Sequence, residues 1–174
     1  MKIFELKQII KEEIDNFLGR GGSKDVYLSQ DPNQVIKKFT GEINKENLIK
    51  EKKLGEKFPK YIAQIFNLDF KKGIMTQEKI DPKKFKLDIQ REFIKLPDNI
   101  QNMFDESGLD DEFEFFITYP QYIQTKELKD KIQKIDNFVK NTLTKSTGTN
   151  IDYPNINNIG YDKDGHLKLL EIFY

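Results

Sequence analysis

Three glycines near the amino end, Gly19, Gly21 and Gly22, lie between two segments that we expect to form strands. The flanking segments 17–18 and 26–28 are apolar and β-prone, which predicts an antiparallel pair joined by this loop. Glycine lacks a Cβ, so its backbone can approach a phosphate group closely and present unobstructed N–H donors. The loop therefore has the composition of a phosphate-binding segment, although an ordinary glycine-rich hairpin turn would have the same sequence pattern.

A lysine on the next expected strand adds a cation to this loop. Residues 18–27 read LGRGGSKDVY and residues 35–37 read VIK, with Val35 and Lys37 on one strand face because side chains alternate. These segments resemble the LGxGxxGxVY loop and the VAIK strand of the eukaryotic-type protein kinases and their kinase-like relatives, with Lys24 in place of the third glycine. The resemblance implies that the three glycines and Lys37 bind the phosphates of ATP, and that Lys37 belongs to the catalytic machinery.

The helix expected after this strand carries a candidate partner for Lys37. Segment 44–57 is rich in Lys, Glu and Leu and has no proline, which predicts a helix that ends at 58–59. The resemblance implies that one glutamate of this helix pairs with Lys37. Glu51 is the first choice and Glu46 the second, and either could instead lie on an exposed helix face.

Two more strands are expected, over 62–69 and 73–78. The end of the second one resembles the hinge of the kinases. This resemblance implies that Gln77 is the gatekeeper and that the backbone of Glu78 and Ile80 forms hydrogen bonds with an adenine ring.

Two oxygen ligands stand near the carboxyl end. Asn158 and Glu171 are thirteen residues apart and flank a predicted hairpin, 159–161 with 167–170, whose turn contains Asp-Gly at 164–165. The segment resembles the kinase hairpin that carries the catalytic-loop Asn and the DFG Asp, with Glu171 in place of the Asp. The resemblance implies that both residues bind Mg²⁺, which prefers oxygen ligands.

Asp152 is the candidate catalytic base in this resemblance. It lies six residues before Asn158 and five before Asn157, so the family's spacing is off by one, and no His-Arg pair precedes it. A turn in a polar loop is the competing interpretation. The single histidine, His166, lies beside the hairpin turn, and we expect it at the surface rather than in catalysis.

Composition excludes several classes of site. The 174 residues contain no cysteine and one histidine, which removes disulfides, thiolate metal sites and cysteine nucleophiles. Lys+Arg and Asp+Glu both total 29, so the sequence has no excess of basic residues, and we expect no nucleic-acid partner. No apolar run approaches the ~20 residues that span a bilayer, and nothing resembles a signal peptide, so we expect a cytoplasmic protein without a membrane partner.

These signals together predict an α+β, kinase-like fold. Residues 1–80 would form a small lobe with an amino-terminal helix over 1–15, an antiparallel sheet and one further helix. Residues 81–174 would form a reduced, mainly helical lobe ending in the hairpin, with a helix predicted from the apolar spacing over 128–143. The acidic run 105–112 is expected to be a solvated loop. Because the sequence ends at Tyr174, the resemblance implies a lobe without an activation segment or a peptide-substrate platform.

Three functions fit this sequence. The first is a degenerate, pseudokinase-type protein that binds nucleotide and acts through binding, with a protein partner. The second is a minimal Mg-ATP-dependent phosphotransferase acting on a protein or a small molecule, with Asp152 and Lys37 as catalytic residues. The third is an adaptor or immunity-type protein without nucleotide, in which the acidic segment 105–114 meets a basic partner.

Overall fold

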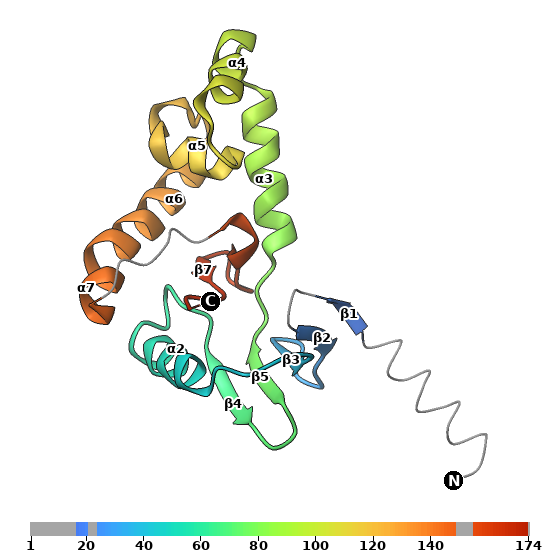
Figure 1. Cartoon of the computed structure of the whole chain (residues 1–174). Helices are drawn as coiled ribbons and strands as arrows, with labels where there is room; N and C mark the ends of the chain where they lie inside the picture. The colour runs from blue at the N-terminus through green and yellow to red at the C-terminus, as the bar shows by residue number, and fades with distance from the viewer. Residues whose placement is uncertain (1–16, 21–23, 149–154, 174) are drawn as a thin grey trace, which may run out of the picture. The chain divides into compact units, whose positions relative to one another are not determined.

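The computed structural model describes residues 17–20, 24–148 and 155–173. The chain divides into two units, one containing residues up to 57 together with 64–79, the other containing 58–63 together with residues from 80 onward. Figure 1 labels strands and helix α2 of the first unit and helices α3 to α7 of the second. The amino-terminal helix predicted over 1–15 lies outside the described residues.

The first unit contains a five-stranded antiparallel sheet in the order β1-β2-β3-β5-β4. Its strands are β1 Phe17–Arg20, β2 Lys24–Leu28, β3 Gln34–Phe39, β4 Ile65–Asp69 and β5 Ile74–Glu78, and helix α2, Lys45–Lys57, connects β3 to β4. Strand β4 begins three residues later than predicted. Ile62 forms a bridge with Leu169, and the Ala63 N–H donates to the Leu169 carbonyl at 2.8 Å, so these residues belong to the second unit.

One face of this sheet carries the core of the first unit. Val35 and Lys37 of β3 are buried, whereas the next residue, Lys38, is exposed. This is the alternation of side chains that a strand requires. Leu48 of α2 packs with Ile65 and Met75. The partly buried apolar side chains around this cluster are Phe39, Ile43, Leu68 and Phe70. Helix α2 therefore covers the apolar face of the sheet.

The second unit is mainly helical. Its elements are α3 Pro82–Ile94, α4 Asp98–Ser107, α5 Glu112–Thr118, α6 Lys126–Phe138, a π-helical turn over Val139–Leu143, α7 Thr144–Thr147, and the strands β6 Ile159–Tyr161 and β7 Leu167–Leu169. The hairpin of β6 and β7 packs against α3 through β6 and against α6 through β7 (Figure 1). The hairpin expected from the Asp-Gly turn is thus present and lies against two helices of its own unit.

The acidic run 105–112 differs from the loop that its charge predicted. Its first residues complete α4, which ends where Gly108 adopts a left-handed conformation with φ 70°. Only a short link follows, because the side chain of Asp111 accepts a hydrogen bond from the Glu114 N–H at 2.9 Å and starts α5. Asp111 and Glu112 of this run lie at the start of α5, where the helix dipole favours negative charge.

A buried carboxylate fixes the start of α6 against α3. Glu92 is 2% exposed and accepts hydrogen bonds from the backbone N–H groups of Gln124 and Thr125, from Thr125 Oγ1 at 2.7 Å and from Lys95 Nζ at 3.1 Å. Burial alone would raise the pKa of Glu92, but the hydrogen bonds from Thr125, Lys95 and Gln124 outweigh it and hold this pKa below its usual value. Glu92 therefore binds the backbone N–H of the α6 N-cap, Thr125, and that of the residue before it.

This architecture confirms the predicted α+β class. An antiparallel sheet with one covering helix occupies the amino-terminal part, and a mainly helical part ends in a β-hairpin, an arrangement consistent with a kinase-like fold. Among the residues that the structure describes, no helix combines the length and the apolar character needed to cross a bilayer.

Candidate functional site

The glycine loop joins β1 to β2, and an ion pair closes its base. Gly19 lies in β1, whereas Gly21 and Gly22 lie outside the described residues. Arg20 and Asp25 face each other across the two strands, with Arg20 Nε donating to Asp25 Oδ1 at 2.7 Å and Nη2 to Oδ2 at 3.4 Å. The hydrogen bond from Arg20 lowers the pKa of Asp25. This pair was not singled out from the sequence, although opposite charges on either side of a glycine loop would have indicated it.

Lys37 lies buried on the inner face of the sheet. Its exposed fraction is 7%, and it stands opposite Met75 of β5 and opposite Val26 of β2. Residues directly opposite each other in an antiparallel pair point to the same face, so Lys37 shares its face with Met75. Met75 belongs to the cluster with Leu48 of α2. The ammonium of Lys37 is therefore carried by the sheet face that α2 covers.

Glu51 and Glu46 occupy different environments on α2. Glu51 is 2% exposed and lies one turn after Leu48, so it shares the buried helix face with that residue. Glu46 is exposed and forms an ion pair with Lys50 at 2.6 Å. Burial of a charged group is costly unless it is paired, and neither Lys37 nor Glu51 is without a partner. Between the two glutamates, Glu51 is thus the candidate for the Lys37 pair.

The end of β5 is held by its neighbours. Gln77 is fully buried, as a residue lining the inner sheet face would be. Glu78 is bonded twice to Gln64, since its N–H donates to the Gln64 carbonyl at 2.8 Å and its carboxylate accepts from the Gln64 N–H at 3.1 Å. The next N–H, of Lys79, donates to the Asn33 carbonyl at 2.8 Å.

The N–H of Ile80 differs from those before it. Within the part of the chain that the structure describes, no backbone hydrogen bond reaches this group. A backbone donor that lacks a protein partner can bind a ligand acceptor. The Ile80 N–H is therefore a candidate donor to a ligand.

The hairpin of the second unit brings the two candidate metal ligands to neighbouring positions. The Leu170 N–H donates to the Asn158 carbonyl at 2.7 Å, and the pairing of Ile159 with Leu169 continues the register. Asn158 thus stands opposite the residue that precedes Glu171, and both candidate ligands are half-buried. Amide and carboxylate oxygens suit Mg²⁺, so the donor set fits this ion. Asp152 lies outside the described residues.

A close backbone approach fixes this hairpin within the second unit. A Cβ at Gly160 would lie 2.6 Å from Ile80 Cγ2 and 2.7 Å from backbone atoms of both Asp81 and Pro82. The neighbouring Tyr161 exchanges two backbone hydrogen bonds with Asp81, at 2.8 and 3.2 Å. Only glycine fits at position 160, so the segment entering α3 can pack directly on β6.

The turn of the hairpin holds a carboxylate with several donors. Asp162 Oδ1 accepts from the N–H groups of Asp164 at 2.9 Å and His166 at 2.8 Å, and Oδ2 lies 3.3 Å from His166 Nδ1 and 3.5 Å from Lys168 Nζ. Burial would raise the pKa of Asp162, but the N–H donors of His166 and Asp164 outweigh it and lower this pKa. The ligand atoms of Asp162, Asp164 and His166 lie within 4.8 Å of one another, yet this geometry is accounted for by the turn itself. The His166 side chain is 68% exposed, in agreement with its expected surface position.

Comparison with known proteins finds similarity to solved structures. No family model and no curated protein matches this sequence. Among solved structures, the chain is similar to the choline kinase LicA from Streptococcus pneumoniae, with 17% sequence identity and a TM-score of 0.39, over 96% of this chain and 68% of that chain.

Proposed function

We propose that this chain is a kinase-like protein that binds a nucleotide. The observation that carries the proposal is the burial of Lys37 and Glu51 on surfaces of β3 and α2 that belong to one packed face. Burying an ammonium and a carboxylate contributes little net stability compared with apolar side chains of similar size. Their presence is better explained by function, because a lysine held by a glutamate is how kinases position a cation for the α- and β-phosphates.

The other candidate residues complete this proposal. The loop glycines would offer backbone N–H groups to the phosphates, and the backbone of Glu78 and Ile80 would bond the adenine ring. Asn158 and Glu171 would hold Mg²⁺, which neutralises phosphate charge when bound. The nucleotide-binding residues of the proposal are Gly19, Gly21, Gly22, Lys37, Glu51, Glu78 and Ile80.

Binding without efficient phosphoryl transfer is the preferred form of this function. Glu171 replaces the shorter Asp of the family pattern, and no His-Arg pair precedes Asp152. An active phosphotransferase is the second candidate, and the hydrogen bond from the Leu170 N–H to the Asn158 carbonyl favours it, because it brings the two candidate metal ligands close along the chain. In that case Asp152 would accept the proton of an acceptor hydroxyl on a protein or a small molecule.

Thermal unfolding with Mg-ATP tests nucleotide binding. A ligand that binds only the folded state at ten times its Kd stabilises the protein by roughly 1.4 kcal/mol, so Tm should rise with ATP concentration. Lys37→Ala should abolish most of this rise. Lys38→Ala is the matched control, because Lys38 is the next residue of β3 and is exposed. Absence of any Tm change with millimolar ATP or ADP in the unaltered protein would favour the adaptor function instead.

Transfer of labelled γ-phosphate separates the binder from the enzyme. The preferred proposal expects ATP binding with no transfer and no hydrolysis above background. Turnover that disappears in Asp152→Asn while ATP binding persists would establish the phosphotransferase. Turnover unchanged in both Asp152→Asn and Lys37→Ala would remove these two residues from the proposed site.

A further inference from the structure

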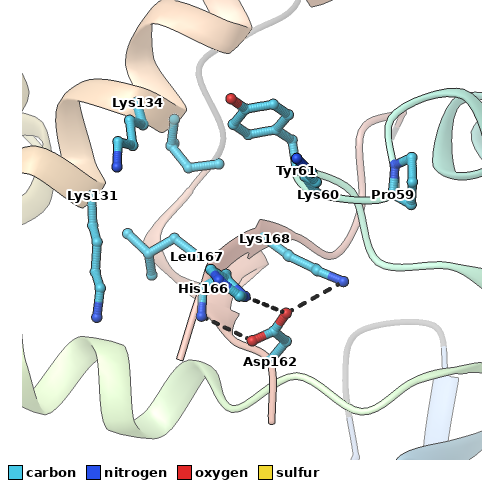
Figure 2. Close-up of a pocket in the computed structure, with 10 residues that line it drawn as sticks. Pro59, Lys60, Tyr61, Lys131, Lys134, Asp162, His166, Leu167 and Lys168 are labelled. Carbon is cyan, nitrogen blue, oxygen red and sulfur yellow. Dashed lines mark hydrogen bonds and ion pairs between the residues drawn. The ribbon is translucent and has the colours of Figure 1, made fainter. Parts of the chain in front are cut away.

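A pocket of about 450 Å³ lies in the second unit, where three segments distant in sequence meet. Figure 2 shows residues 59–61, side chains of α6 and the hairpin turn around it. The lining residues with ionisable or polar side chains are Lys60, Tyr61, Lys131, Lys134, Asp162, His166 and Lys168. None of the residues assigned to nucleotide or magnesium lines this pocket.

The charge of the lining is strongly positive. Four lysines face one carboxylate, Asp162, whose oxygens are already engaged by the hairpin turn and by Lys168. Lys131 has a compensating partner in Glu127, at 2.7 Å. Lys60 and Lys134 have no ion pair within the described residues, and both are exposed. Two uncompensated cations therefore border the pocket.

Lys168, one of the four lysines that line this pocket, is buried. Its side chain is 9% exposed, and its Nζ lies 3.5 Å from Asp162 Oδ2. The dashed lines in Figure 2 show that His166 and Lys168 both converge on Asp162. Because desolvation strengthens electrostatic interactions, a buried ammonium attracts an anion more strongly than an exposed one does.

The remaining walls are apolar and well packed. Ile135 and Leu167 are buried, and Pro59 and Tyr61 line the other side. The Tyr61 ring is stacked on Phe138 with centroids 4.4 Å apart and planes 8° from parallel. Stacking restricts the Tyr61 ring, so this wall keeps its shape without a ligand.

We propose that this pocket binds a small organic phosphomonoester. Lysine ammonium groups bind phosphate as point charges, and Lys60, Lys134 and Lys168 would provide them. The apolar walls would contact the organic part of the ligand. The volume lies within the range of ~300–1,000 Å³ typical of small-molecule sites, which favours a small ligand over a polymer.

Titration calorimetry with phenyl phosphate tests the proposal. Phenyl phosphate combines one phosphomonoester with an aromatic body, and we expect saturable binding at one site that weakens with added salt. Phenol and inorganic phosphate, which each lack one half of this chemistry, should bind more weakly. The double variant Lys60→Gln and Lys134→Gln should reduce the affinity roughly tenfold or more, since each removes an uncompensated charge near the phosphate.

Matched variants make the result decisive. Lys126→Gln removes the same charge from an exposed position of α6 that does not line the pocket, and it should leave the affinity unchanged. Lys38→Ala, at an exposed position of β3 in the first unit, should also retain phenyl phosphate binding. Three results would overturn the proposal: no saturable binding, equal affinity in the double variant, or an equal loss of affinity in the Lys126→Gln control. Binding of an acidic peptide but not of phenyl phosphate would also overturn it.

Discussion

The Leu170 N–H donates a hydrogen bond to the Asn158 carbonyl at 2.7 Å, and Glu171 is the next residue along the chain. The turn between β6 and β7 thus brings close together two positions, Asn158 and Glu171, that are thirteen residues apart in the sequence. Both side chains are half-buried and flank the β6–β7 hairpin. A divalent ion held there would need little reorganisation of the backbone.

Replacement of Glu171 should change the metal dependence of nucleotide binding. In Glu171→Ala one anionic ligand is lost, so the Mg²⁺ concentration needed for half-maximal ATP binding should increase about tenfold or more. Glu171→Asp should retain most of the dependence. Calorimetric titrations of ATP at several Mg²⁺ concentrations provide the measurement. Asp164→Ala is the control, because Asp164 is an exposed carboxylate of the same hairpin, and an identical response of both alanine variants would contradict the role of Glu171.

Gly160→Ala should destabilise the second unit. The added methyl group would lie within 2.7 Å of the Asp81 and Pro82 backbone, which cannot move aside as a flexible side chain would. We expect a loss of about 1–3 kcal/mol in the free energy of unfolding, measured by urea denaturation. Gly41→Ala should change it by less than about 0.5 kcal/mol, because open space surrounds Gly41. Equal stability of the two variants would show that the close approach is absent in solution.

Glu92 should make the stability of the protein depend on acidic pH. Its pKa is lower in the folded state, so its contribution is present above the unfolded value of about 4.3 and is lost as the pH falls through the folded pKa. Glu92→Gln should therefore lower stability at pH 7 by roughly 1–3 kcal/mol, and the difference should shrink below about pH 4. Urea denaturation across this range measures it. Glu106→Gln, at an exposed position, should show no such pH-dependent difference from the unaltered protein.

A double-mutant cycle tests whether Lys37 and Glu51 interact. Glu51→Leu should cost about 3 kcal/mol or more if it leaves the buried Lys37 ammonium uncompensated. The double variant Glu51→Leu with Lys37→Met should recover part of that loss. Glu46→Leu serves for comparison, since Glu46 is exposed. Strictly additive effects of the Lys37 and Glu51 substitutions would exclude a direct pair.

Local patterns predicted the elements whose partners lie nearby in sequence. The alternation of side chains placed Val35 and Lys37 on one strand face, and Asp-Gly at 164–165 indicated the hairpin, because each depends on local geometry. No helix was predicted within 83–118, although Asp81 caps α3 and Phe85 and Ile89, one turn apart, lie on its buried face. The short helix α5 buries Phe113, Phe115 and Phe116 on several sides. Its apolar residues therefore do not show the spacing of an amphipathic helix.

The cationic pocket was missed for a related reason. Lys60 and Lys134 are ordinary members of a lysine-rich sequence, and no spacing rule relates them. They border one pocket only because residues 58–63 join the second unit, where Tyr61 stacks on Phe138 of α6. Packing between residues so far apart in the chain produces no local pattern that a single sequence could reveal.

The bridge from Ile62 and Ala63 to Leu169 has a consequence for any attempt to dissect the molecule. Because residues 58–63 are inserted into the second unit, the polypeptide changes unit after Lys57, after Ala63 and after Lys79. A fragment that starts at residue 80 would lack the backbone neighbour of β7. Neither unit is one continuous segment of the chain, so a single cut cannot separate one intact unit from the other. The two units should therefore be produced and studied together.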